Sequence, residues 1–136
     1  MNKHSGRIFF SILSIFFLSN LIIGSMVELS FDESYYWIYS EYMALGYFDH
    51  PPMMAVFIKM GTFLFGHSEM AVRFFFNVFM CGTIYLIWDM VGKKNQLLFW
   101  ASIFSKPLIY WSGILALPDT PLLFFGTLYF YVLKKY

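Results

Sequence analysis

Long apolar runs alternate with short polar segments along this chain. The first run covers residues 8–27, about the twenty residues that an α-helix needs to cross the hydrocarbon core of a bilayer. Three more runs cover approximately residues 74–91, 96–117 and 119–133. The pattern therefore predicts four transmembrane helices, with a long loop, 28–73, between the first two.

The long loop has a pattern of its own, which predicts two short helices lying on the membrane surface. Ser30 and Glu33 have the spacing of a capping box, in which the serine oxygen accepts the N3 amide and the glutamate returns to the cap amide. Gly46 is expected to end this first helix, since glycine readily adopts left-handed dihedrals. Methionines and phenylalanines over residues 53–65 leave only a thin polar edge, as in an interfacial helix. Ser68 then stands where an N-cap of the second transmembrane helix is expected.

The composition supports a membrane protein. Hydrophobic residues make up 60% of the chain and charged residues 12%, against roughly 25% charged residues in soluble domains. We therefore predict an all-α integral membrane protein in contact with the lipid bilayer. The net charge of +1 and the lack of a basic stripe argue against nucleic acid as a partner. Cys81 is the single cysteine, so no intrachain disulfide is expected.

The charged residues sort across the predicted helices as the positive-inside rule requires. With four crossings, the basic residues that fall on the cytoplasmic side are Lys3, Arg7, Lys93, Lys94, Lys134 and Lys135. The acids that fall on the opposite side are Glu28, Asp32, Glu33, Glu41, Asp49, Glu69 and Asp119. Both termini are accordingly expected in the cytoplasm. Lys59, Arg73 and Lys106 do not follow this sorting.

A cleavable signal peptide is the alternative for the first run, because Lys3 and Arg7 precede it. The run is longer than the apolar core of a signal peptide, and no small-residue cleavage site follows Val27. We therefore favour a retained helix.

An acidic and aromatic cluster, Asp32-Glu33-Ser34-Tyr35-Tyr36-Trp37, follows the first run. Asp32 falls in the first helical turn and is not needed for the capping box, so its carboxylate is a candidate for chemistry. Tyr36 and Trp37 offer flat amphipathic rings on which a sugar can rest. Two other interpretations stay open, namely a solvated helix start for Asp32 and an aromatic belt at the membrane interface for the rings.

The dipeptide Asp49-His50 precedes two prolines, which place it on a stiff backbone, as in a positioning element. His67 and Glu69 could join Asp49 and His50 around a metal ion, but the spacing matches no zinc pattern. We instead expect His67 and Glu69 to mark the boundary before the second transmembrane helix.

Asp119 lies in the turn between the third and fourth runs. The predicted topology returns this turn to the membrane face of Asp32, so that two carboxylates from distant parts of the chain could meet. The alternative is that Asp119 serves as an ordinary cap at the start of the fourth helix.

Four motifs, in order along the chain, resemble one family. They begin at Asp32 (Asp-Glu-x-Tyr-Tyr-Trp), Gly46 (Gly-Tyr-Phe-Asp-His-Pro-Pro), Ser68 (Ser-Glu-x-x-x-Arg) and Pro118 (Pro-Asp-x-Pro-Leu). The series is similar to the N-terminal part of the bacterial dolichyl-phosphate-mannose protein mannosyltransferase-like glycosyltransferases, which have the GT-C fold and are related to the aminoarabinose transferases of lipid A. The resemblance implies a bacterial inner membrane protein. Its relatives transfer a sugar from a polyprenyl-phosphate carrier to a protein or glycolipid acceptor on the outer side.

The resemblance also implies roles for single residues. Asp32 matches the first-loop aspartate that acts as general base or orients the acceptor, and Asp119 matches the second acidic position. Asp49 and His50 match a carrier-facing turn, in which a basic residue of the aminoarabinose relatives contacts the carrier phosphate. Arg73 is expected to face the same phosphate, with an arginine snorkelling to the lipid headgroups as the alternative. A divalent cation, if the reaction uses one, would bind at Asp32.

Members of this family are several times longer than the 136 residues of this chain. We therefore expect the front part of a GT-C architecture, without transferase activity on its own. A small four-span transporter acting as a homodimer and an inactive remnant are the alternatives. A transporter normally buries an ionisable residue at mid-membrane, whereas here only Lys106, in the third run, lies deep.

Overall fold

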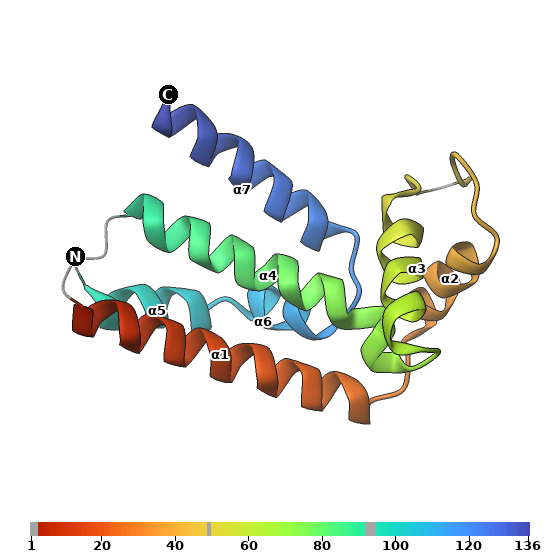
Figure 1. Cartoon of the computed structure of the whole chain (residues 1–136), viewed down its shortest axis with the longest axis horizontal. Helices are drawn as coiled ribbons and strands as arrows, with labels where there is room; N and C mark the ends of the chain where they lie inside the picture. Colours follow the sequence, from red (N-terminus) through yellow and green to blue (C-terminus); the bar gives the residue numbers. More distant parts are fainter. Residues whose placement is uncertain (1–2, 49, 92–94) are drawn as a thin grey trace.

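The structure is a computed structural model, and it describes residues 3–48, 50–91 and 95–136. Within these residues the chain forms seven α-helices and no strand, which confirms the all-α prediction. The helices are α1 (Lys3–Met26), α2 (Phe31–Glu41), α3 (Met53–Phe65), α4 (Glu69–Val91), α5 (Gln96–Phe104), α6 (Pro107–Ile114) and α7 (Asp119–Lys135). Helices α1, α4 and α7 run alongside one another, and α5 and α6 follow one another along the same bundle (Figure 1).

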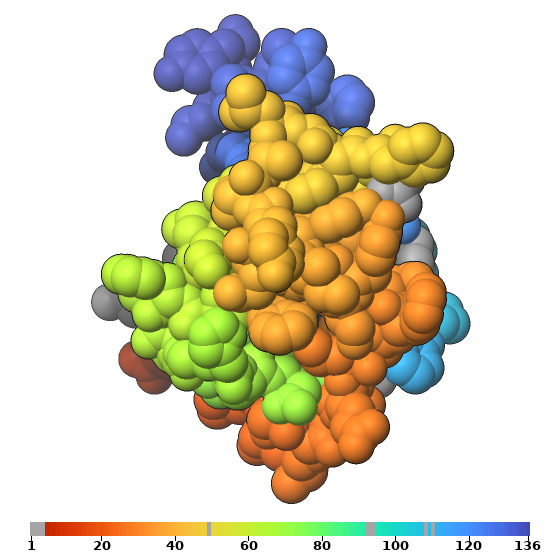
Figure 2. All heavy atoms as spheres, turned by 90° about the vertical axis from the view of Figure 1, so that its right-hand side faces the viewer, coloured from red at the N-terminus to blue at the C-terminus, as the bar shows by residue number. Residues whose placement is uncertain are grey.

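Helices α2 and α3 lie at one end of the bundle, and the start of α1 and the end of α7 lie at the other (Figure 1). We call α2, α3 and the described residues between them the cap, and this end of the bundle the cap end. Seen from this end, the cap covers much of the face, with the start of α4 beside it and α7 behind it (Figure 2). The long loop predicted at 28–73 is therefore mostly helical.

Two of the described helices are long and apolar enough to cross a membrane, Ser5–Met26 within α1 and Glu69–Val91, which is α4. Together with the composition, they support a membrane protein. Helix α7 has 17 residues, and the third apolar run is divided between two shorter helices. Four crossings therefore stay a prediction.

The third run, predicted as one helix over 96–117, is broken between α5 and α6. Helix α5 ends at Phe104, and Lys106 has an extended backbone, with φ −104° and ψ 102°. Pro107 explains the break, because a proline lacks an amide hydrogen and disfavours the helical conformation of the residue before it. As the first residue of α6, by contrast, Pro107 is well placed.

Two apolar clusters hold the bundle together. The first joins α1, α4 and α5 around Phe9, whose ring stacks on Trp88 at a centroid distance of 3.8 Å and an interplanar angle of 7°. The second joins the cap to the start of α4, through buried side chains that include Tyr36, Ile58 and Phe76. The cap is thus packed on the bundle by its own apolar core.

Three local predictions for the loop are confirmed. Ser30 Oγ accepts a hydrogen bond from the Glu33 amide at 3.3 Å, and the Ser30 amide donates to Glu33 Oε2 at 3.0 Å, which completes the capping box. The second short helix has the predicted bounds, Met53–Phe65. Ser68 Oγ accepts the Ala71 amide at 3.3 Å, as expected of an N-cap of α4.

The predicted end of the first short helix at Gly46 is wrong, since α2 ends at Glu41. Tyr47 explains the early end, because its ring stacks on Tyr39 with centroids 3.9 Å apart. Its hydroxyl, which has a single proton, lies 2.7 Å from the carbonyl oxygen of Tyr39 and 3.2 Å from that of Tyr42. The Tyr39 carbonyl, in the last turn of α2, is therefore satisfied by a side chain rather than by a glycine turn.

Close packing of α3 on α4 predicts that Gly61→Ala destabilises the protein. A Cβ at Gly61 would lie 2.0 Å from the carbonyl oxygen of Ala71, which belongs to the backbone and cannot rotate away. Overpacking of this kind costs about 1–3 kcal/mol. We expect a lower midpoint of thermal unfolding in detergent micelles. Gly126→Ala on α7 is the control, because a Cβ there meets nothing within 4 Å and alanine favours a helix.

Candidate functional site

Asp32 lies in the first turn of α2, with its side chain exposed. The capping box orients this turn, since it turns Glu33 into the protein while Asp32 faces outward. Within the described parts of the chain, no donor is bonded to the Asp32 carboxylate. The carboxylate is therefore open to a ligand at the cap end.

Glu33 and Arg73 form a buried ion pair, with side chains 0% and 3% exposed. Arg73 Nε donates to Glu33 Oε1 and Nη2 donates to Glu33 Oε2, both at 2.7 Å. Nη1 donates to the carbonyls of Gly24 at 2.6 Å and Val27 at 2.7 Å, and Nη2 to that of Glu28 at 2.9 Å. All five N–H bonds of the guanidinium therefore have acceptors within the protein.

The prediction that Arg73 faces a carrier phosphate does not agree with this geometry, and neither does the snorkelling alternative. Every donor of Arg73 is occupied, and the side chain is buried. The physical reason is that α1 ends at Met26, where its last carbonyls lack partners in the helix, and Arg73 supplies those partners. Arg73 thus holds the end of α1 against the start of α2.

The pKa of Glu33 reflects the balance of forces at this pair. Burial raises the pKa, but hydrogen bonds from Arg73, Ala116 and Ser30 and the charge of Arg73 outweigh burial, so the pKa lies below its ordinary value of 4.5. A lowered folded-state pKa stabilises the folded protein above the unfolded-state value, and this contribution disappears as pH falls through the folded-state value. The ion pair therefore stabilises the folded protein fully at neutral pH.

We expect the thermal stability of the protein to fall as the pH drops below 4.5, the ordinary pKa of the glutamate. Protonation of Glu33 would leave the buried charge of Arg73 without its partner. Unfolding midpoints in detergent between neutral pH and mild acid measure this loss. Glu33→Gln, which has no proton to gain, should show a shallower decline below pH 4.5, and an equal decline in both proteins would contradict the assignment.

Two of the loop motifs meet through Tyr36 and His50. The Tyr36 hydroxyl lies 3.0 Å from His50 Nε2, and the two rings are 5.0 Å apart at their centroids. Trp37 lies edge to face with His67, with centroids 6.2 Å apart. The structure thus brings Tyr36 and His50 together on the cap, with Trp37 on the same helix. Asp49 lies outside the described residues.

The segment before Asp119 is tied to the cap by a hydrogen bond that neither motif predicts. The Ala116 amide donates to Glu33 Oε1 at 2.9 Å and so ties the start of α2 to the segment before α7. Asp119 is the first residue of α7 and is exposed. Its N-cap is Pro118, which makes no side-chain cap bond, so Asp119 is not the cap residue of this helix. The starts of α2 and α7 lie at the same end of the bundle (Figure 1).

Beside Asp119 the surface is hollowed over a volume of about 450 Å³. The hollow lies along α7 and is lined by Ser112, Asp119, Leu122, Leu123, Gly126, Thr127 and Phe130. A carboxylate at the end of a mainly apolar hollow suits an amphiphilic ligand, with a polar group at Asp119 and an apolar chain along the helix.

The described residues do not form the metal site that the sequence analysis considered at Asp49, His50, His67 and Glu69. Among the described residues, no group of three or more histidine, cysteine or acidic side chains is suited to a metal ion. His67 lies against Trp37, and Glu69 occupies the first turn of α4. A single cation ligand at Asp32 stays a prediction.

That the unsorted basic residues pair with acids of the loop could have been anticipated, although their individual partners could not. Arg73 and Lys59 both depart from the positive-inside sorting, and both lie in or beside the acidic loop. Lys59 Nζ lies 3.1 Å from Glu41 Oε1, and Arg73 pairs with Glu33. A basic residue that departs from the positive-inside sorting therefore indicated an ion pair with an acid of the loop. The sequence did not specify which acid.

A comparison with protein families gives one match. The model of a family described as dolichyl-phosphate-mannose-protein mannosyltransferase matches residues 49–136, more than half of the chain. The matched range includes Asp119 and begins after the motif of Asp32. No curated protein and no solved structure shows a significant match.

Proposed function

Because the chain belongs to the dolichyl-phosphate-mannose-protein mannosyltransferase family, we propose that it forms the front of a GT-C glycosyltransferase in a bacterial inner membrane. The proposed reaction transfers a sugar from a polyprenyl-phosphate carrier to a protein or glycolipid acceptor on the outer side. The cap end carries the reacting groups, and α7 offers the apolar surface for the carrier chain.

In the proposed reaction, Asp32 takes the proton of an acceptor hydroxyl while the acceptor oxygen attacks the anomeric carbon. The glycosidic bond forms as the bond between the anomeric carbon and the phosphate oxygen breaks, with inversion. The polyprenyl phosphate leaves with the electron pair of that bond. Since phosphate is already a stable leaving group, the protein needs only to activate the acceptor and stabilise charge.

The single observation that carries this proposal is the hydrogen bond between Glu33 and Ala116. It fixes the helix start that presents Asp32 against the segment that leads to Asp119, although these parts are far apart in sequence. Asp119 is the proposed partner that orients the acceptor or a cation. His50, with Asp49 beside it in sequence, belongs to the proposed carrier-facing turn, and Trp37 to the proposed sugar surface, whereas the ring of Tyr36 is buried in the core of the cap.

Binding of a labelled polyprenyl-phosphate sugar to the purified chain in lipid nanodiscs tests the proposal. We expect saturable binding that unlabelled polyprenyl phosphate displaces. Gly126→Leu should weaken this binding, because a side chain at Gly126 enters the open hollow beside Asp119. Val132→Leu adds bulk to an exposed part of α7 outside the hollow and is the matched control.

Two outcomes would contradict the proposal. The first is the absence of saturable binding to the folded chain. The second is flux of a solute driven by a pH gradient in proteoliposomes without any carrier binding, which would support the transporter alternative.

A further inference from the structure

A lysine stands at the break in the third apolar run. Lys106 lies between α5 and α6, and its side chain is exposed on the surface of the bundle. It makes no side-chain cap bond to α6, and no described carboxylate lies within ion-pair distance of it. Lys106 therefore presents an ammonium group without a described counter-ion.

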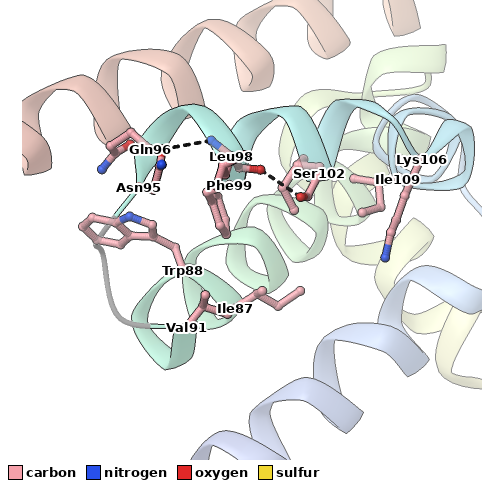
Figure 3. A pocket seen from close by; sticks show the side chains of 11 residues that line it. Ile87, Trp88, Val91, Asn95, Gln96, Leu98, Phe99, Ser102, Lys106 and Ile109 are labelled. Atoms are coloured by element: carbon pink, nitrogen blue, oxygen red, sulfur yellow. Dashed lines mark hydrogen bonds between the residues drawn. The ribbon is translucent and has the colours of Figure 1, made fainter.

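An apolar groove of about 410 Å³ leads to this lysine along α4 and α5. Its walls include Ile87 and Val91 of α4 and Leu98 and Phe99 of α5, and Lys106 stands at the start of α6 (Figure 3). The mouth at the other end carries Asn95 and Gln96. Among its described lining residues, the groove thus combines a mainly apolar surface with the positive charge of Lys106.

The charge lies deep if the run at 96–117 crosses the bilayer, as the sequence predicts. At 1.5 Å per residue, Lys106 is about 15 Å from either end of that run, which is the middle of a hydrocarbon core about 30 Å thick. A charged side chain at this depth normally faces a partner charge or water rather than lipid tails.

Among the described residues, no carboxylate lies at this depth. Six of the seven carboxylate side chains that the structure describes lie at the cap end, in α2, at the starts of α4 and α7, or just after α1. The seventh, Asp89, lies near the other end of α4, where it accepts a hydrogen bond from the Tyr131 hydroxyl at 3.0 Å. A second copy of the chain would carry its carboxylates at the same levels.

We propose that the groove and Lys106 bind a transmembrane helix that lies outside residues 1–136 and presents an aspartate or glutamate at mid-membrane depth. The carboxylate pairs with the ammonium group, and apolar side chains of the helix pack along α4 and α5. A phospholipid headgroup is a poorer fit, because headgroups lie at the membrane surface and the lysine stem is too short to reach them from the centre.

Association of the full chain with synthetic helices in liposomes tests the proposal. The probes are apolar transmembrane peptides with a single central aspartate, asparagine or lysine, and energy transfer between dyes on the peptide and the chain reports association. We expect the aspartate peptide to bind about tenfold more tightly than the asparagine peptide, since a charged carboxylate accepts a stronger hydrogen bond from the ammonium group than a neutral amide does.

Charge exchange at Lys106 makes the test specific. Lys106→Met should remove the preference for the aspartate peptide, and Lys106→Glu should transfer the preference to the lysine peptide. Unfolding midpoints of both variants, compared with that of the native chain, are the check that the variants remain folded. An unchanged preference in Lys106→Met, or equal binding of all three peptides to the native chain, would overturn the proposal.

A separate measurement checks the depth on which the proposal rests. Lys106→Cys should not react with a membrane-impermeant maleimide in intact liposomes, with the unsubstituted chain giving the background from Cys81. Rapid labelling would place this residue in water and overturn the proposal while leaving the proposed sugar transfer untouched. If the preference for the aspartate peptide depends on added anionic phospholipid, a lipid occupies the groove. This result would overturn the proposal that a helix binds there.

Discussion

Replacing Arg73 with methionine is expected to destabilise the protein by about 3–5 kcal/mol, the typical cost of removing one partner of a buried ion pair. The variant leaves the Glu33 carboxylate charged and buried, and it leaves the carbonyls of Gly24, Val27 and Glu28 without their donor. The five hydrogen bonds of Arg73 at the cap end are therefore lost together. Thermal unfolding in detergent micelles, with limited proteolysis of the cap, measures the loss.

Lys59→Met is the matched control for this prediction. Its partner Glu41 is also in the cap, but the side chains are 44% and 31% exposed, and such pairs contribute less than about 1 kcal/mol. Adding Glu33→Gln to Arg73→Met should restore part of the stability, because the second change removes the uncompensated charge. Equal effects of Arg73→Met and Lys59→Met would show that the buried pair does not hold the cap.

Asp32→Asn is expected to lower the rate of sugar transfer by roughly 10²–10⁴-fold, the usual contribution of a general base. The carboxylate is exposed and has no bonded donor in the described structure, so the unfolding midpoint should not change. The assay follows label from the polyprenyl-phosphate sugar into the acceptor, in membranes that carry the chain and show the proposed transfer.

Glu41→Gln supplies the control for Asp32→Asn, because it removes another exposed acid of the same helix. Its rate should remain close to that of the unsubstituted protein. Transfer at the normal rate by Asp32→Asn, or an equal loss in both variants, would exclude Asp32 as the general base.

Local features of the cap were accessible from sequence, because their interactions span three or four residues. The capping box at Ser30 and Glu33 and the N-cap at Ser68 depend on side chains beside the backbone groups that they satisfy. Helix α3 begins after Pro52 and ends before Gly66, which is its C-cap. Gly46 was misjudged for the opposite reason. The residue that ends α2 is Tyr47, which returns to Tyr39 after the chain has turned.

Long-range partners were beyond the sequence. The pattern showed that Arg73 was out of place, and it also showed an excess of acids in the loop. It did not show that the guanidinium meets Glu33, 40 residues earlier, and the end of α1. A phosphate and a buried carboxylate satisfy a guanidinium equally well, so only the packing of α1, α2 and α4 decides between them.

At the acidic and aromatic stretch around Asp32, sequence and tertiary structure determine different properties. The sequence by itself determined an apolar, helical membrane protein with a capped helix whose first turn contains Asp32, and its motifs indicated the family that the match to residues 49–136 supports. The tertiary structure decided which charges are structural and which are open, since it buries Glu33 and Arg73 together and leaves Asp32 and Asp119 exposed. The physical reason is that capping is settled within one turn of helix, whereas burial and pairing depend on contacts such as that between Glu33 and Ala116, 83 residues apart.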